Sequence, residues 1–281
     1  MFNLLVAELK KRGTAVIGWG MGIGAYLAMI MAMAPDLAPQ FANIDLASIP
    51  IYKAFGMIEN FFSITSLIAI YVSFLGLTIA VYAVITGANA LAGEEEDGTL
   101  ETLLALPLAR WQIVLMKIVA TAIALLIVLL IAHLGYLIVF PSVQADLEGQ
   151  INMTNLLWST LEAWPLAFMF AMLTLFMGAY LPRRNHAMGV GLTVLLGGYL
   201  FNNLAEQAGP LQDLRPFFPF YYNLGGKVLT EGVDWGKAGV LVGAGIVFAL
   251  LALLSFQRRD VTVGAWPWAR LATRTAVRTQ E

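Results

Sequence analysis

The longest uninterrupted run of charged residues in the sequence is acidic, from Glu94 to Asp97, and glycines stand on either side of it at Gly93 and Gly98. Adjacent carboxylates repel one another and stay hydrated unless basic groups approach. The chemistry that they offer is therefore charge pairing with a surface rich in Lys or Arg. We interpret the run as a docking site for a soluble partner and not as a catalytic centre. The alternative is a solvated loop that only separates two helices.

A short amphipathic helix is predicted after the acidic run. Glycine costs a helix roughly 1 kcal/mol relative to alanine, so the preceding helix is expected to end or bend near the run between Gly93 and Gly98. Thr99 can cap a new helix, Glu101 falls in its first turn near the positive end of the dipole, and Pro107 ends this helix or starts the next one. A helix of about two turns is unstable alone in water, so neighbours must hold one side of it. Three leucines at helical spacing form its apolar face: Leu100, Leu103 and Leu104.

No constellation for catalysis or cofactor binding is found in the sequence. It contains no Cys and only two His, His133 and His186, without an H-E-x-x-H pattern. The sequence also contains no nucleotide-binding G-x-x-x-x-G-K-[ST] loop. Gly225-Gly226-Lys227 resembles its end, but Val228 follows where the motif needs Ser or Thr. We therefore expect that this chain is not an enzyme by itself, binds no cofactor or metal, and relies on a separate polypeptide for any ATPase activity.

The elements that position these residues must cross a membrane. Of the 281 residues, 59% are hydrophobic and 12% are charged, and the mean hydropathy is +0.77, whereas soluble domains carry roughly 25% charged residues. Because a span needs about 20 apolar residues, the sequence predicts an all-α integral membrane protein with six transmembrane helices in a single domain over residues 1–281. The predicted spans are 14–34, 61–91, 113–140, 158–181, 187–205 and 238–256.

The distribution of basic residues predicts which segments face the cytosol. With a cytosolic N-terminus, twelve of the sixteen Lys and Arg residues fall on the inner side and four on the outer side, as the positive-inside rule requires. Both termini, the tail over residues 257–281 and the segment 93–110 are then cytosolic. This topology is compatible with the inner (plasma) membrane of a prokaryote.

Helices outside the predicted spans are expected at two places. Residues 1–12 carry apolar residues at helical spacing and predict an interfacial helix on the inner leaflet. Between the fifth and sixth spans, prolines and an aromatic cluster over residues 206–237 predict short re-entrant or interfacial helices, which form either an external gate or a simple aromatic anchor.

Small and polar residues inside the spans suggest contacts with other helices or with a transported compound. The pairs Gly18 with Gly22 and Gly20 with Gly24 allow close helix approach, either within the chain or toward a dimer or pathway. Four polar residues are candidates for a pathway: His133, Glu162, Asn202 and Asn203. For His133 the alternative is a hydrogen bond within the bundle, and for Glu162 it is a position at the outer interface.

The acidic run and the helix after it resemble the cytosolic coupling segment of the type-2 family of ABC transporter permeases. In that family an acidic pair is followed by Gly-Thr-Leu-Glu, a Leu-Leu pair, a proline, an arginine and a lysine, and this sequence matches every position, with Lys117 as the lysine. The residues that the resemblance assigns to docking an ATPase are Glu94, Glu95, Glu96, Asp97, Gly98, Thr99, Leu100, Glu101, Leu103, Leu104, Pro107 and Arg110.

The resemblance extends to the whole chain and implies a permease subunit of an ATP-driven exporter. The family has an N-terminal elbow helix, six spans, a coupling helix between spans 2 and 3, and short re-entrant helices before the last span. Two cytosolic ABC ATPase subunits, which hold ATP and Mg, would act on two permease subunits, either a homodimer or a pair with a related chain. A second docking loop would contain Arg183, Arg184 and Asn185. The alternative for Arg183 and Arg184 is a plain anchor that follows the positive-inside rule.

The residues from Glu8 to Trp19 resemble the antibiotic and drug exporter branch of the family. This implies export of a hydrophobic or amphipathic compound such as an antibiotic, drug or lipid, and no nucleic-acid partner. Two alternatives come from other classes: a non-transporting membrane scaffold or assembly factor, and a secondary transporter, which would need ion-coupling charges or broken inverted repeats in the membrane.

Overall fold

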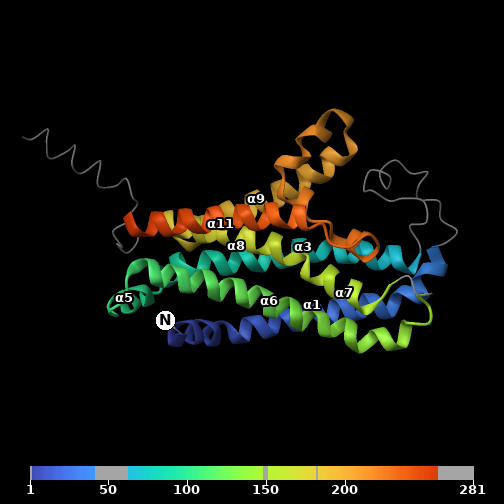
Figure 1. Ribbon diagram of the computed structural model, residues 1–281, viewed down its shortest axis with the longest axis horizontal. Coiled ribbons are helices and arrows are strands. Elements are labelled where there is room, and N and C mark those ends of the chain that lie inside the picture. Colours follow the sequence, from blue (N-terminus) through green and yellow to red (C-terminus); the bar gives the residue numbers. More distant parts are fainter. Residues whose placement is uncertain (1, 42–62, 148–150, 182, 259–281) are drawn as a thin grey trace, which may run out of the picture.

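The computed structural model describes residues 2–41, 63–147, 151–181 and 183–258, and all regular structure in this part of the chain is helical. Six of its helical segments are long and apolar enough to cross a membrane, and they run side by side in one bundle (Figure 1). The predicted all-α membrane fold with six spans is confirmed. The long helices are α1 (Phe2–Phe41), α3 (Ile64–Ala88), α6 (Arg110–Val143), α8 (Ala163–Tyr180), α9 (Arg184–Gln207) and α11 (Trp235–Arg258).

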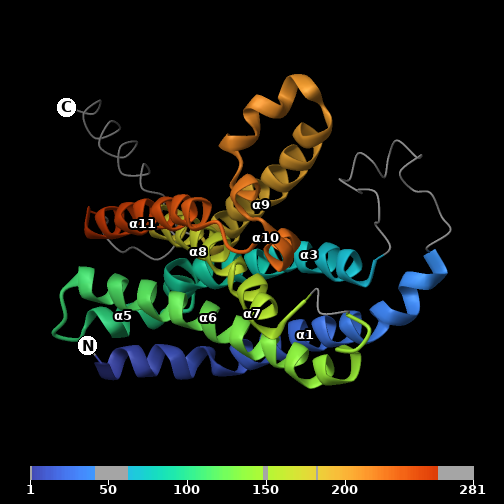
Figure 2. The same cartoon turned by 45° about the vertical axis from the view of Figure 1, so that its right-hand side comes forward.

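The first helix corrects the expectation of a separate interfacial helix over residues 1–12. Helix α1 is continuous from Phe2, and Gly13 lies within it. The reason is that Glu8 is buried and forms an ion pair with Lys117 of α6, so the first turns pack along α6 instead of lying apart from the bundle. The last turns of α1, which hold Pro35 and Pro39, bend away from the preceding part (Figure 2).

The α1 and α6 helices approach each other closely at three glycines, Gly20 and Gly24 of α1 and Gly135 of α6. A Cβ atom on Gly135 would lie 2.0 Å from the carbonyl oxygen of Gly24, and one on Gly20 would lie 2.7 Å from Cβ of Ile131. The pair Gly20 and Gly24 therefore serves packing within the chain. In contrast, a Cβ atom on Gly18 or Gly22 would meet nothing within 4 Å, so this second pair faces open space.

The fourth span consists of two helices that meet at Glu162. Helix α7 (Met153–Leu161) ends there and α8 begins at the next residue. Helix α8 lies in the middle of the bundle, packed between α3 and α11 (Figure 1), and its side chains Leu166, Phe170 and Leu175 are fully buried. It is therefore the core of the domain.

Short helices connect α9 to α11, as the sequence predicted. They are η3 (Gly209–Phe217), η4 (Pro219–Tyr222), η5 (Gly225–Lys227) and α10 (Val228–Glu231). The end of α9 and η3 project sideways from the bundle (Figures 1 and 2). The η5 turn instead packs into the bundle against α3, where a Cβ atom on Gly226 would lie 1.9 Å from the carbonyl oxygen of Ala69.

Candidate functional site

The predicted docking segment, residues 93–110, lies at one end of the bundle, beside the start of α1 (Figure 1). We call this segment the coupling segment and this end of the bundle the α5 end. Helix α3 continues through a π-helical turn, η2 (Asn89–Gly93), into α4 (Glu94–Glu96), and the chain then reverses into α5 (Thr99–Leu104). Gly98 makes the reversal with φ of 71°, in the left-handed region that favours glycine. The helix thus continues past Gly93 and ends at Glu96, between the two glycines.

Thr99 does not cap α5 as predicted. Gly98 occupies the N-cap position, and the Thr99 hydroxyl donates a hydrogen bond to the carbonyl oxygen of Glu94, at 3.3 Å. The residue before the helix must adopt the left-handed conformation, which a threonine avoids. The Thr99 side chain thus fastens α5 to α4.

Helix α5 has one face toward the bundle and one toward solvent. Leu100 is fully buried, Leu103 and Leu104 are half-buried, and Glu101 is exposed. After the helix, Leu106, Pro107 and Arg110 are exposed, and the Leu106 side chain keeps 45% of its accessible area. The coupling segment therefore presents an apolar and charged surface that the described part of the chain does not cover.

Half of the acidic run behind α5 is buried, which corrects the expectation that all four carboxylates are hydrated. Glu94 and Glu95 are buried, and the basic partners of Glu94 come from this chain. Its Oε2 lies 2.5 Å from Nζ of Lys117, which is 1% exposed, and its Oε1 lies 2.9 Å from Nζ of Lys11. Only Glu96 and Asp97 are exposed in the run. Glu94 is therefore an internal ion-pair partner, while Glu96 and Asp97 remain at the surface together with the residues after them.

Lys117 also bonds Glu8 of α1, with 2.9 Å between Nζ and Oε1. Arg12 lies 3.6 Å from the other oxygen of Glu8 and donates to the Thr121 hydroxyl of α6 at 2.7 Å. We call these five charged residues, Glu8, Lys11, Arg12, Glu94 and Lys117, the ion cluster. Because a buried charge without its partner is costly, the cluster fixes the coupling segment to α1 and α6.

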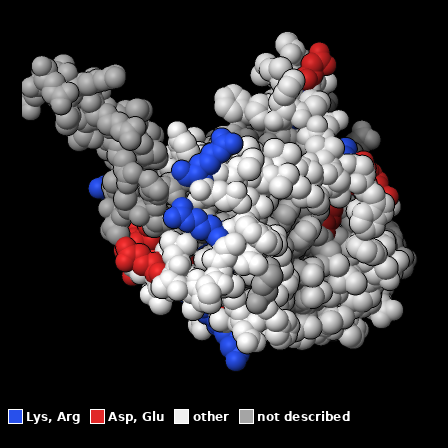
Figure 3. Space-filling model, turned by 60° about the vertical axis from the view of Figure 1, so that its left-hand side comes forward, with Lys and Arg blue, Asp and Glu red and all other residues white. Residues whose placement is uncertain are grey.

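The predicted second docking loop is partly used inside the chain. The Arg184 backbone N–H donates to Oε1 of Glu96 at 2.9 Å, and the Arg184 guanidinium donates to Oδ1 of Asn89 at 3.3 Å. Glu96 thereby stabilises the start of α9, where a carboxylate is favourable. Arg183 and Asn185 are exposed beside it and extend the uncovered surface of the α5 end. Charged side chains gather at this end on an otherwise mostly uncharged surface (Figure 3).

The four candidates for a pathway have different surroundings. His133 is buried, with its Nδ1 atom 3.4 Å from the Thr160 hydroxyl, which agrees with the alternative of a hydrogen bond within the bundle. Asn202 is buried on α9, and Asn203 beside it is half-buried. None of the four lines the cavity described below.

Glu162 has a structural role at the junction of α7 and α8. Its carboxylate accepts hydrogen bonds from the backbone N–H groups of Leu224 and Gly225, at 2.7 and 3.2 Å, and from Nδ2 of Asn223 at 2.8 Å. It therefore holds the η5 turn against the α7–α8 junction. Sequence reasoning missed this contact because the two segments are about sixty residues apart and no local pattern joins them.

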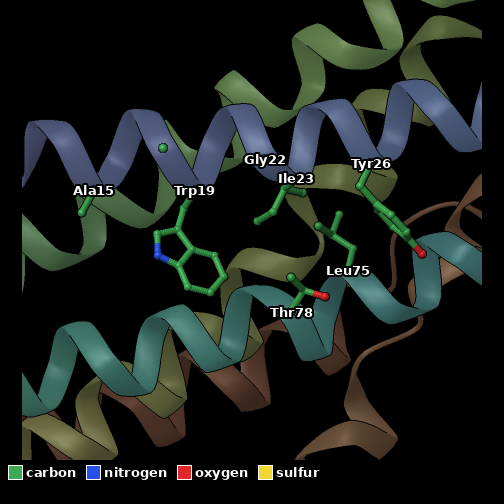
Figure 4. Close-up of a pocket in the computed structure, with 8 residues that line it drawn as sticks. Ala15, Trp19, Gly22, Ile23, Tyr26, Leu75 and Thr78 are labelled. Atoms are coloured by element: carbon green, nitrogen blue, oxygen red, sulfur yellow. The ribbon is translucent and has the colours of Figure 1, made fainter.

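A cavity of about 590 Å³ lies between α1 and α3 (Figure 4). The Trp19, Ile23 and Tyr26 side chains point from α1 toward α3 across it. The signal in the sequence was the open pair Gly18 and Gly22 on either side of Trp19. The lining residues are Ala15, Gly18, Trp19, Gly22, Ile23, Tyr26, Leu75 and Thr78.

The search for a metal site in the described part of the chain and the comparison with curated proteins found nothing, whereas a family model matches most of the chain. Among the described residues, no group of three or more His, Cys, Asp or Glu side chains could hold a metal ion. A comparison with curated proteins found no match. Residues 6–261 match the sequence model of the ABC-2 family transporter proteins, a range that contains the coupling segment, the ion cluster and most of every long helix.

Proposed function

Because this chain belongs to the ABC-2 family of transporter proteins, we propose that it is the permease subunit of an ATP-driven exporter. Membership makes it a multi-pass membrane component that associates with an ABC ATPase. The proposal adds the direction and the driving force: ATP binding and hydrolysis on the separate ATPase drive export of a hydrophobic or amphipathic compound, such as an antibiotic, drug or lipid.

The observation that carries the proposal is that ion pairs connect the coupling segment to two transmembrane helices. Its outer surface, with Glu101, Leu106 and Pro107, is exposed, while Glu94 behind it is locked by Lys117 to α1 and α6. A force applied to α5 by a bound ATPase would therefore reach two transmembrane helices through short ion pairs. ATP binding would bias the bundle toward one of two arrangements, as expected of a ligand-driven switch.

The complete transporter in this proposal has two permease subunits and two ATPase subunits. The second permease is a copy of this chain or a related one. ATP and Mg are held by the ATPase subunits, and this chain binds no cofactor. The α5 end and both termini face the cytosol of a prokaryote, in agreement with the excess of Lys and Arg on that side.

The test is to express the tagged chain with the ABC ATPase encoded beside it and to measure co-purification and stimulated ATPase activity. Glu101→Lys, on the exposed face of α5, is expected to lower both at least about tenfold, since reversing a charge at an interface produces like-charge repulsion worth several kcal/mol. Glu231→Lys is the matched control, because Glu231 is an exposed acid in α10. If the chain captures no P-loop ATPase, the proposal fails.

Transport itself separates this proposal from the two alternatives. Membrane vesicles that contain the complex and ATP should accumulate the compound only when the ATPase has an intact nucleotide site. A scaffold would show docking without movement, and a secondary transporter would move the compound in response to an ion gradient without ATP.

A further inference from the structure

The cavity between α1 and α3 has a shape and lining that fit a hydrocarbon chain. Its walls are apolar side chains of both helices, and Gly18 and Gly22 leave open space on the α1 side. The lining of α1 extends from Ala15 to Tyr26, which is about 16 Å along a helix with 1.5 Å rise per residue. Pockets of this volume and character are typical of sites for small apolar or amphipathic molecules. We call the eight lining residues the α1–α3 groove.

A few polar groups interrupt the apolar lining. The Trp19 indole N–H has no hydrogen-bond partner among the described residues, although a half-buried indole usually finds one. The Thr78 hydroxyl donates to the carbonyl oxygen of Phe74 and can still accept a bond. The Trp19 ring packs on Tyr82, with 5.3 Å between ring centroids. Few polar groups on apolar walls are what an amphipathic ligand requires.

Positive charge lies at one end of the groove. Arg12 precedes Ala15 by one helical turn and Trp19 by two turns, so it lies on the same face of α1. Two cations of the ion cluster, Lys11 and Arg12, lie at this end, where Lys11 pairs with Glu94 and Arg12 with Glu8. Lys11 remains accessible, with 57% of its side chain exposed. An anionic group at this end would find both charge and donors.

From the open cavity, its apolar walls and the accessible Lys11 side chain at its end, we propose that the α1–α3 groove binds an anionic amphiphile from the adjacent membrane leaflet. The hydrocarbon chain lies along Trp19 and Ile23, and the anionic headgroup lies at Lys11 and Arg12. The position of the headgroup at the cytosolic membrane surface rests on the proposed function, because that function orients the α5 end. The binding itself needs neither the ATPase nor ATP.

The experiment uses the full chain in vesicles of zwitterionic phosphatidylcholine, without ATPase. The probe is a long-chain alkyl phosphate that carries a diazirine in its chain, and the sites of photolabelling are mapped by peptide mass spectrometry. Labels should concentrate on α1 and α3 at the groove, and excess unlabelled alkyl phosphate should remove them. Labels spread evenly over the exposed faces of α9 and α11, or labels that do not compete, would overturn the proposal.

The groove can be filled without a clash, since a Cβ atom on Gly18 or Gly22 meets nothing within 4 Å. The double variant Gly18→Leu with Gly22→Leu should label at least about tenfold less, because losing contact with two methylene groups already has this effect. Gly243→Leu in α11 is the matched control, since Gly243 also has open space around it. Unchanged labelling in the double variant would refute the site.

Two further measurements test the ligand's charge and the competing occupant. The neutral alcohol with the same chain should label about fivefold less, the factor expected for one basic residue near a membrane surface. Equal labelling would overturn the anionic headgroup. Because the sequence has no cysteine, a disulfide in the Gly22→Cys variant can form only between two copies of the chain. Efficient formation of such dimers, with a yield that added alkyl phosphate does not lower, would show that a protein helix fills the groove. The proposal would then be wrong.

These outcomes are distinct from those of the proposed function. If labelling fails while Glu101→Lys still abolishes ATPase docking, only the amphiphile site is wrong. If labelling succeeds and no ATPase is captured, the groove remains a binding site in a protein that is not driven by ATP.

Discussion

Lys117 of α6 forms a buried ion pair with Glu94 of α4, with 2.5 Å between Nζ and Oε2. The two residues are 23 positions apart, and the exposed α5 helix lies in the stretch between them. The ion pair therefore joins the two ends of the stretch that contains α5. Movement of α5 cannot be independent of α6 while this pair is intact.

Replacing Lys117 should destabilise the protein strongly. Lys117→Met would leave the Glu8 and Glu94 carboxylates buried without their shared cation, at an expected cost of about 3–5 kcal/mol. Thermal unfolding of the purified protein in detergent measures this loss. Lys10→Met is the control, because Lys10 is exposed on α1. The double variant Lys117→Met with Glu94→Gln should recover part of the loss, and no recovery would argue against the ion pair as the cause.

A side chain at position 98 is expected to lower both the stability of the protein and its stimulation of the ATPase. The φ of 71° at Gly98 lies in the left-handed region, so Gly98→Ala should cost about 1 kcal/mol or more and shift α5. Gly13→Ala is the control, because Gly13 lies inside α1 with open space around it and alanine there should stabilise the helix by about 0.5–1 kcal/mol. ATPase stimulation and thermal unfolding are measured together. Normal ATPase stimulation by Gly98→Ala would show that coupling does not depend on the exact geometry of the chain reversal between α4 and α5.

The sequence predicted the fold because each span carries its own signal. An uncharged run of about 20 residues has few alternatives in a membrane, so the six long helices followed from composition alone. The expected end of the helix between Gly93 and Gly98 likewise rested on the local sequence. The continuous start of α1 was not predicted, because it depends on Glu8 meeting Lys117 from a distant helix. A run of charges near a terminus gives no sign of such a partner.

The candidate site shows the same limit. Four adjacent acids predicted a surface for a basic partner, which stays a prediction, and the structure places Glu101 and Pro107 on the exposed side of the same segment. What the pattern could not show is that Lys11 and Lys117 supply the positive charge for Glu94 from within the chain. Similarly, the two glycine pairs of α1 look alike in sequence, yet only Gly20 and Gly24 face α6.

Glu162 is expected to hold the η5 turn in place. Glu162→Ala would leave the backbone N–H groups of Leu224 and Gly225 without their acceptor, at about 1–3 kcal/mol for each group left buried. Hydrogen–deuterium exchange should become faster at these two amides before it changes in α8. Glu162→Gln keeps one acceptor oxygen and should show a smaller effect. Equal exchange in all three proteins would mean that the turn is held by its packing on α3.

The contact between α1 and α6 gives a prediction that separates the two glycine pairs. In Gly135→Ala the new methyl group would lie 2.0 Å from the carbonyl oxygen of Gly24, so the helices must move apart. Overpacking of this kind typically costs about 1–3 kcal/mol. Gly22→Ala adds the same methyl group to α1 where nothing lies within 4 Å, and it should not destabilise the protein. Thermal unfolding of the two variants provides the comparison. A Gly22→Ala variant that is as unstable as Gly135→Ala would show that the groove side of α1 is packed against another helix in the assembled protein.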